Sequence, residues 1–162
     1  MSVKKLHTEF NTFYYYTFTC FQWWNLFDIT NLYDFIYQWF GILLKIKVYN
    51  CGFVIMPNHM HGLVYTRNEQ QTKNKIIGTG KRFIAYEIVD HLELLCRKDL
   101  LKIMSDAVTP YDKSRNKHHE VFEDSFDCKE IITETFIRQK LTIYIKTRHT
   151  RRTLSSFAIC NL

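Results

Sequence analysis

Two strand-like segments separated by only a Pro-Asn pair constrain the fold of this chain most. Residues 47–56 and residues 59–66 are rich in apolar, aromatic and β-branched side chains, as strands are. A connection this short pairs its two strands antiparallel. His59 and His61 lie in the second segment, and side chains at i and i+2 of a strand point to the same face. The sequence therefore predicts a β-hairpin that presents two imidazoles on one side.

Segments around this hairpin predict a further strand and two helices. The aromatic run from Phe13 to Phe21 predicts a strand. Asp28 is placed to cap a helix, whose apolar residues recur at helical spacing: Ile29, Leu32, Ile36, Trp39, Phe40 and Leu43. A polar linker is expected from Arg67 to Lys75. A second helix is expected over residues 81–96, with one apolar face made of Phe83, Ile84, Ile88, Leu92 and Leu95.

The C-terminal third is more polar. Residues 105–120 are rich in turn-forming residues, which predicts an exposed loop. Apolar residues after Thr133 predict a last helix that ends near Lys146, and the final twelve residues, 151–162, show no helix or strand pattern. The resulting order is β-α-β-β-α-(β)-α, with the strand in parentheses the least defined. This order predicts an α+β sandwich with helices on one side of an antiparallel sheet.

Size and charge favour a single domain with an anionic partner. The chain has 162 residues, of which 46% are hydrophobic, enough for one core and short for two. Its formal net charge of +6 favours nucleic acid as the partner. Residues 135–162 contain no Asp or Glu, so this end is either a solvated basic tail or a surface that follows phosphates.

Neither cysteine spacing nor hydropathy indicates secretion or a membrane span. The five cysteines form no C-x-x-C pair, so we expect reduced thiols rather than a zinc knuckle or disulfides. The polar first nine residues do not resemble a signal peptide. The longest apolar run, residues 35–44, is too short to cross a bilayer. We expect a soluble, cytoplasmic protein.

A family resemblance rests on several blocks of sequence. The stretch "GFVIMPNHMHGLVY" resembles the HUH motif of the bacterial IS200-like transposases. In the same order, further blocks resemble those of the REP-associated tyrosine transposase subfamily: "YYYTFTCFQWWNLFDITNLYDFIYQWF", "IIGTGKRFIAYEIV", "HEVFEDSFDCKE" and "FIRQKL". The resemblance covers roughly residues 13–141 and implies an IS200-like transposase domain over residues 1–141, with a ferredoxin-like antiparallel sheet.

The resemblance also implies an activity and its residues. Such enzymes nick and rejoin hairpin-forming single-stranded DNA during DNA transposition and recombination, as monomers or homodimers. His59 and His61 would bind a divalent metal ion, Mg²⁺ or Mn²⁺. A helix tyrosine would attack the scissile phosphate, keep the 5′ end as a phosphotyrosine and release the 3′-hydroxyl. Tyr144 is the candidate nucleophile, because it lies on the predicted basic last helix.

Basic residues near two of the helices are candidates for binding the DNA backbone. They are Lys73, Lys75, Lys81 and Arg82 near the second helix, and Arg138 and Lys140 on the last helix. An ordinary charged linker explains the first group equally well. The Gly-Thr-Gly-Lys sequence that ends at Lys81 is not a nucleotide-binding loop, because a Walker A motif would need Ser or Thr at position 82.

The nucleophile segment departs from the family pattern. The family segment resembles Gln-Lys-Leu-x-Tyr-Ile-His-x-Asn-Pro, in which the Asn shares the helix face of the Tyr and helps to hold the metal. This chain has Gln-Lys-Leu-Thr-Ile-Tyr-Ile-Lys-Thr-Arg over residues 139–148. Tyr144 is therefore displaced by one position. Arg148 replaces the Asn, and a guanidinium repels a metal ion.

A one-base deletion after Leu141 would explain this departure. Synonymous codons for residues 142–148, written ACT ATA TAC ATA AAA ACC CGT, give Tyr-Ile-His-Lys-Asn-Pro when translated from the third base. On this hypothesis residues 142–162 are an out-of-frame basic tail.

Two functions remain open at the level of sequence. The chain is either an HUH-type single-strand endonuclease and transposase, or a catalytically inactive DNA-binding relative with a degenerate C-terminus. A nucleotide hydrolase with an H-x-H-x-H motif is disfavoured, because Leu63 stands where the third histidine would be.

Overall fold

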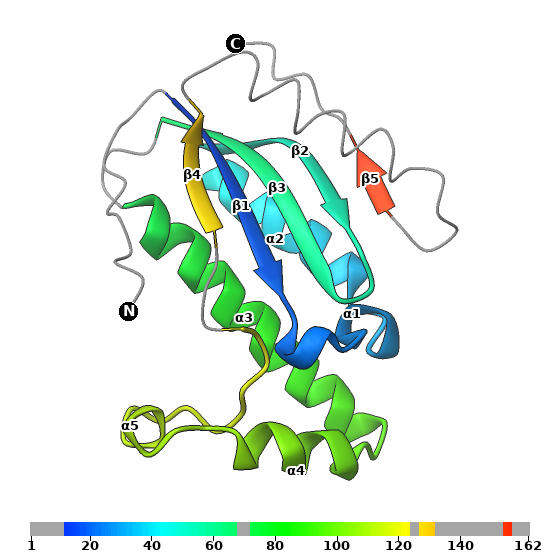
Figure 1. Cartoon of the computed structure of the whole chain (residues 1–162). Coiled ribbons are helices and arrows are strands. Elements are labelled where there is room, and N and C mark those ends of the chain that lie inside the picture. The colour runs from blue at the N-terminus through cyan, green and yellow to red at the C-terminus, as the bar shows by residue number, and fades with distance from the viewer. Residues whose placement is uncertain (1–11, 68–71, 124–126, 132–153, 157–162) are drawn as a thin grey trace.

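One antiparallel sheet organises the protein, and Figure 1 shows it from the side away from the long helices. The computed structural model describes residues 12–67, 72–123, 127–131 and 154–156. The strand order is β4-β1-β3-β2-β5, and each neighbouring pair is antiparallel. The strands are β1 (Thr12–Thr19), β2 (Val48–Ile55), β3 (His59–Thr66), β4 (Asp127–Ile131) and β5 (Leu154–Ser156). The predicted hairpin of β2 and β3 is confirmed.

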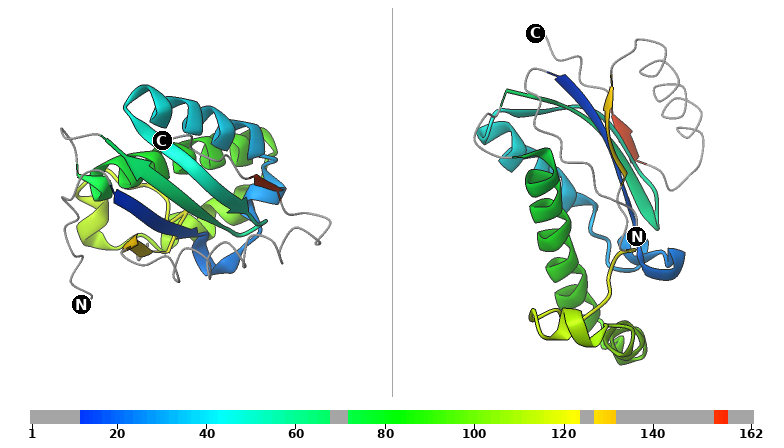
Figure 2. Two further views of the ribbon diagram at one scale, coloured as in Figure 1. Left: turned by 90° about the horizontal axis from the view of Figure 1, so that it is seen from above. Right: turned by 60° about the vertical axis from the view of Figure 1, so that its left-hand side comes forward.

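The two long helices lie on one face of the sheet (Figure 2). In the chain, α2 (Tyr33–Lys45) lies between β1 and β2, and α3 (Lys73–Leu94) lies between β3 and β4. The shorter helices are η1 (Phe21–Trp23), α1 (Leu26–Ile29), α4 (Lys98–Asp106) and α5 (Pro110–Lys113). Strand order 4-1-3-2 with two helices on one face is the ferredoxin-like arrangement. The predicted α+β class is therefore confirmed.

Both long helices begin at residues other than the predicted ones. The predicted cap Asp28 lies inside α1, and α2 begins only at Tyr33, because Asn31 takes a left-handed backbone conformation with φ of 49°. The α3 helix begins at Lys73 rather than residue 81. Thr72 caps it by accepting a hydrogen bond from the Lys75 amide at 3.3 Å. The polar surface of its first two turns concealed this start in the sequence.

The expected exposed loop over residues 105–120 is partly wrong. It includes the end of α4 and all of α5. Thr109 caps α5 by accepting from the Asp112 amide at 3.1 Å, with Pro110 in the first turn. In α4, Met104 is completely buried against the main core, which holds this polar helix on the protein.

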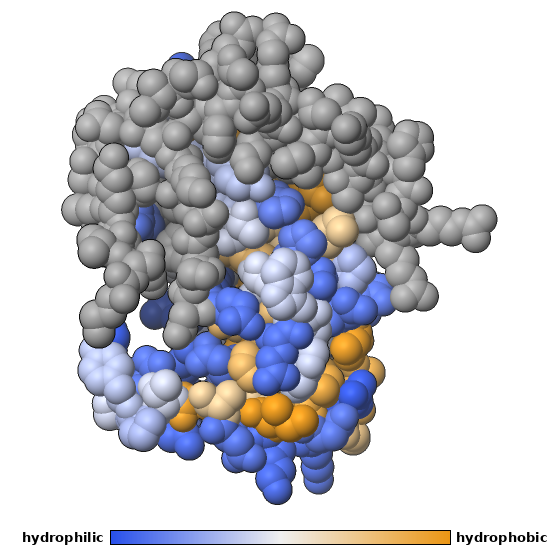
Figure 3. Space-filling model, viewed as in Figure 1, coloured by the Kyte–Doolittle hydropathy of each residue, from blue (hydrophilic) through white to orange (hydrophobic). Residues whose placement is uncertain are grey.

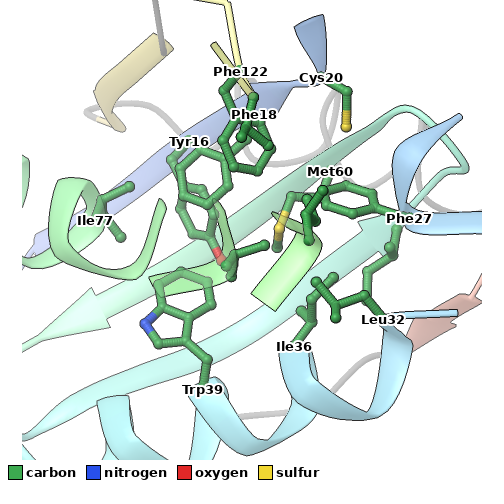
Figure 4. Close-up of a cluster of buried hydrophobic side chains, with 14 of the residues drawn as sticks. Tyr16, Phe18, Cys20, Phe27, Leu32, Ile36, Trp39, Met60, Ile77 and Phe122 are labelled. Carbon is green, nitrogen blue, oxygen red and sulfur yellow. The ribbon is translucent and has the colours of Figure 1, made fainter. Parts of the chain in front are cut away.

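The main core fills the space between the sheet and the helices. Aromatic rings of β1 pack there against α2, with Tyr16, Phe18 and Trp39 in mutual contact (Figure 4). From α3 the buried residues are Ile76, Ile77, Ile84, Ile88 and Leu92. Phe83 and Leu95, which were predicted on the same face, are 50% and 53% exposed. The side of α3 that packs on the core runs through Ile84, Ile88 and Leu92. Phe83 lies on another side of the helix, and Leu95 follows the end of the helix at Leu94.

Two glycines are needed where aromatic rings lie close to the backbone. A Cβ on Gly62 of β3 would overlap the Tyr16 ring. A Cβ on Gly80 of α3 would overlap the Trp39 indole of α2. The first contact lies within the sheet, where Tyr16 of β1 is directly opposite Gly62 of β3, and the second brings the two long helices together at close range.

Several features lie outside the main layers. Among the described residues, no helix is both long enough and apolar enough to cross a membrane. Apolar side chains gather over the end of α3 and α4 (Figure 3), where Leu94, Leu95 and Ile103 are exposed. The predicted last helix and the division of the chain after Leu141 fall on residues 132–153, outside the described residues. β5 is a short strand that the sequence did not predict.

Candidate active site

The two histidines of β3 lie together on the sheet face opposite the long helices. Alternation along β3 sends Met60 and Val64 into the main core. It places His59 and His61 on the other face, in the same row as Leu63. Their ring centroids are 4.9 Å apart, and the ring planes are inclined by 74°. The two imidazoles are therefore close enough to bind one ion together.

His59 is held by the residue that precedes it. Its Nδ1 lies 2.7 Å from the side-chain oxygen of Asn58. The Asn58 amide nitrogen donates to the Trp23 carbonyl oxygen at 3.1 Å, which turns the Asn58 oxygen towards His59. The amide oxygen only accepts, so the His59 proton is on Nδ1 and the lone pair is on Nε2. Burial lowers the pKa of His59, which favours the neutral form that binds metals.

His61 is held by two hydroxyl groups of β1. Its Nδ1 lies 2.7 Å from the Tyr15 hydroxyl and 2.8 Å from the Thr17 hydroxyl. The register places Thr17 directly opposite His61. Tyr15 also stacks on the imidazole, with ring centroids 5.6 Å apart. Both hydroxyls can donate or accept, so Nδ1 is engaged in either tautomer and the ring orientation is fixed.

This geometry fits two ligands of a divalent ion. The hydrogen-bonded Nδ1 atoms correspond to the outer-shell bonds that orient metal-binding histidines. Within the described part of the chain, no group of three or more His, Cys, Asp or Glu side chains could complete such a site. Imidazole suits transition ions, whereas Mg²⁺ prefers oxygen ligands. Because Mn²⁺ and Mg²⁺ both favour oxygen ligands, either ion would need oxygen donors in addition to the two imidazoles.

Three of the predicted site residues lie outside the described residues. They are the nucleophile candidate Tyr144 and the DNA-contact candidates Arg138 and Lys140. Their predicted roles stay predictions.

The other DNA-contact candidates lie on α3, which packs against the opposite face of the sheet from the histidines. Lys73 and Lys75 are in its first turn rather than in a linker. Lys81 donates to the Glu123 carbonyl oxygen at 2.5 Å and lies over the Phe122 ring, so it fixes the segment that leads to β4. Arg82 is exposed and lies over Phe83.

The Gly-Thr-Gly-Lys sequence is helical and forms no phosphate-binding loop. It lies within α3, where the backbone amides are used in helical hydrogen bonds. The structure therefore agrees with the sequence in excluding a Walker A site there.

The supporting residues around the histidines were not found from the sequence. Asn58 was assigned only to the turn, and Tyr15 and Thr17 only to a strand. Tyr15 and Thr17 could be assigned to His61 only from the pairing register of β1 against β3. Hydrophobic periodicity does not give that register.

Comparison with known proteins finds similar folds but no similar sequences. No family model matches the chain, and no curated protein matches it either. Among solved structures, it is similar to a REP-associated tyrosine transposase bound to a REP hairpin, with a TM-score of 0.55 and 13% sequence identity over 92% of this chain and 74% of that chain. The two proteins share their fold. A transposase-like protein from Deinococcus radiodurans R1 also matches, with a TM-score of 0.44 and 11% identity over 93% of this chain and 96% of that one.

Proposed function

We propose that this protein binds hairpin-forming single-stranded DNA at the histidine face of its sheet, and that it descends from enzymes that nick and rejoin such DNA through a tyrosine. The observation that carries the proposal is the pair of imidazoles 4.9 Å apart, each fixed at Nδ1 by a neighbouring side chain. The shared fold with a transposase bound to a REP hairpin supports DNA as the partner. The net charge of +6 agrees with it.

We expect a divalent ion to bind the scissile phosphate of the DNA. His59 and His61 would hold Mn²⁺ or Mg²⁺ through their other ring nitrogens. When bound, such an ion neutralises phosphate charge and orients the phosphodiester for in-line attack. Asn58, Tyr15 and Thr17 keep the imidazoles in place, so that the ring positions do not depend on the ion.

The tyrosine step exchanges one phosphoester bond for another. The phenol oxygen of Tyr144 would form a bond to phosphorus as the bond from phosphorus to the 3′-oxygen breaks. The phenol proton is lost, and the 3′-oxygen gains a proton to become a free hydroxyl. The DNA 5′ end stays on the protein as a phosphotyrosine, and the reverse reaction rejoins a strand.

A catalytically inactive DNA-binding relative is the second candidate, and residues 142–148 favour it. Tyr144 is displaced by one residue from the family position, and Arg148 stands where a metal-binding Asn is expected. An inserted residue rotates the following part of a helix by about 100°. A misplaced nucleophile can reduce the rate on the order of 100-fold.

Covalent trapping distinguishes the two candidates. Labelled hairpin DNA and Mn²⁺ are incubated with this chain, its Tyr144→Phe variant and a version with the reading frame restored after Leu141. We expect little or no protein-DNA adduct from the chain as it stands and a clear adduct from the frame-restored version. A strong adduct from the present chain that disappears in Tyr144→Phe contradicts inactivation by frameshift. Hairpin binding with no adduct from any version contradicts the endonuclease proposal and leaves the binding protein.

A further inference from the structure

An exposed tryptophan lies beside the histidine pair. Trp23 is 61% exposed, whereas Trp39 in the core is 5% exposed. The Trp23 ring centroid is 5.6 Å from that of His59, with the ring planes inclined by 65°. An exposed indole beside a polar site presents a flat aromatic surface to a ligand bound there.

The backbone around Trp23 adopts an unfavourable conformation. Gln22 and Trp23 are consecutive residues with φ of 49° and 58°. Residues with side chains rarely adopt positive φ, and such strain persists only where surrounding structure enforces it. It is concentrated at ligand-binding and active sites.

Hydrogen bonds to two other segments of the chain enforce this conformation. The Gln22 amide donates to the Glu123 carboxylate at 2.8 Å. The Phe21 amide donates to the Val121 carbonyl at 2.9 Å. Asn58 donates to the Trp23 carbonyl at 3.1 Å. The loop that carries the indole is thus tied to the β2–β3 turn and to the segment before β4.

We infer that Trp23 is a stacking platform for an unpaired base of the single-stranded DNA that the histidine face binds. The inference rests on the proposed function. Aromatic side chains bind single-stranded nucleic acid by stacking on bases, and a rigid indole loses little entropy when it does so. The contact between the Trp23 and His59 rings places a stacked base next to the phosphate that the histidines would bind. Trp23 would therefore fix which phosphate reaches them.

One other exposed aromatic residue, Tyr86, provides a matched control. Tyr86 is 56% exposed but lies on α3, which packs against the face of the sheet opposite the histidines. Tyr86→Ala therefore removes a ring of similar exposure without touching the site. Trp23→Phe keeps a smaller stacking surface.

A double-mutant cycle between protein and DNA tests the inference. Affinities for a hairpin with a single-stranded flank are measured by fluorescence anisotropy, with an abasic nucleotide placed in turn at each flank position. We expect Trp23→Ala to weaken binding by about 5- to 150-fold, as for a lost base-aromatic stack. Trp23→Phe should keep most of the affinity, and Tyr86→Ala should keep all of it. One abasic position should weaken binding to the wild type but not to Trp23→Ala.

Two results overturn the inference without affecting the proposed function. In the first, the wild type prefers hairpin DNA and Trp23→Ala binds it equally well. In the second, Trp23→Ala loses Mn²⁺ binding together with DNA binding, measured by electron paramagnetic resonance, so that the indole acts only by supporting His59. Absence of any hairpin preference in the wild type contradicts the proposed function itself.

Discussion

The side-chain oxygen of Asn58 accepts the Nδ1 proton of His59 at 2.7 Å. This bond leaves the lone pair on Nε2, so a turn residue determines which atom of His59 can bind a metal. The Asn58 side chain is itself oriented by its bond to the Trp23 carbonyl. The orientation of His59 and the conformation of the neighbouring loop therefore depend on one amide group.

Removing this amide should weaken metal binding. We expect Asn58→Ala to reduce Mn²⁺ affinity by about 10- to 100-fold, as for other residues that orient metal ligands. Asn58→Asp keeps an acceptor for Nδ1 and should keep most of the affinity. Titration followed by electron paramagnetic resonance gives both values. Equal affinity in Asn58→Ala and the wild type would show that His59 does not need this support or does not bind the ion.

The two hydroxyls on His61 should act redundantly. Tyr15→Phe and Thr17→Val each leave one hydroxyl within hydrogen-bonding distance of Nδ1, so each alone should lower Mn²⁺ affinity only slightly. The double variant leaves neither, and we expect its loss to exceed the sum of the single losses in free energy. The same titration checks this. Strictly additive losses would contradict a shared role at His61.

A pair of glycines in α3 should respond in opposite directions to the same substitution. A Cβ on Gly78 would meet open space, whereas a Cβ on Gly80 would overlap Trp39. Gly78→Ala should stabilise the protein by about 0.5–1 kcal/mol, because alanine favours helix. Gly80→Ala should destabilise it by about 1–3 kcal/mol through overpacking. Urea unfolding measures both, and stabilisation by Gly80→Ala would contradict the close contact of α2 with α3.

The central β2–β3 hairpin of the sheet was predictable because its signals are local. The composition of residues 47–56 and 59–66 and the short Pro-Asn turn predicted the hairpin. The two-residue spacing of His59 and His61 predicted their shared face, and the structure has both. Helix starts were less predictable. The left-handed conformation of Asn31 and the cap at Thr72 decide where α2 and α3 begin, and hydrophobic periodicity does not detect either feature.

The surroundings of the site depend on contacts between distant segments. Tyr15 and Thr17 reach His61 across 46 and 44 residues of sequence, and the Trp23 loop depends on Glu123, 101 residues from Gln22. Such contacts follow from strand register and loop conformation, which a single sequence specifies only through the complete fold. The family resemblance supplied the metal and nucleophile hypotheses, and it supplied none of these supporting residues.

The most direct measurement compares affinity for hairpin-containing single-stranded DNA with affinity for duplex DNA of the same sequence, over a range of salt concentrations. We predict tighter binding of the hairpin at every concentration, with both affinities decreasing as salt increases because phosphate contacts release counterions. Mn²⁺ should strengthen hairpin binding by the wild type and have no effect on a variant with both His59 and His61 replaced by Ala. Equal affinity for hairpin and duplex at all salt concentrations would contradict a single-strand DNA site and leave only a generic basic surface.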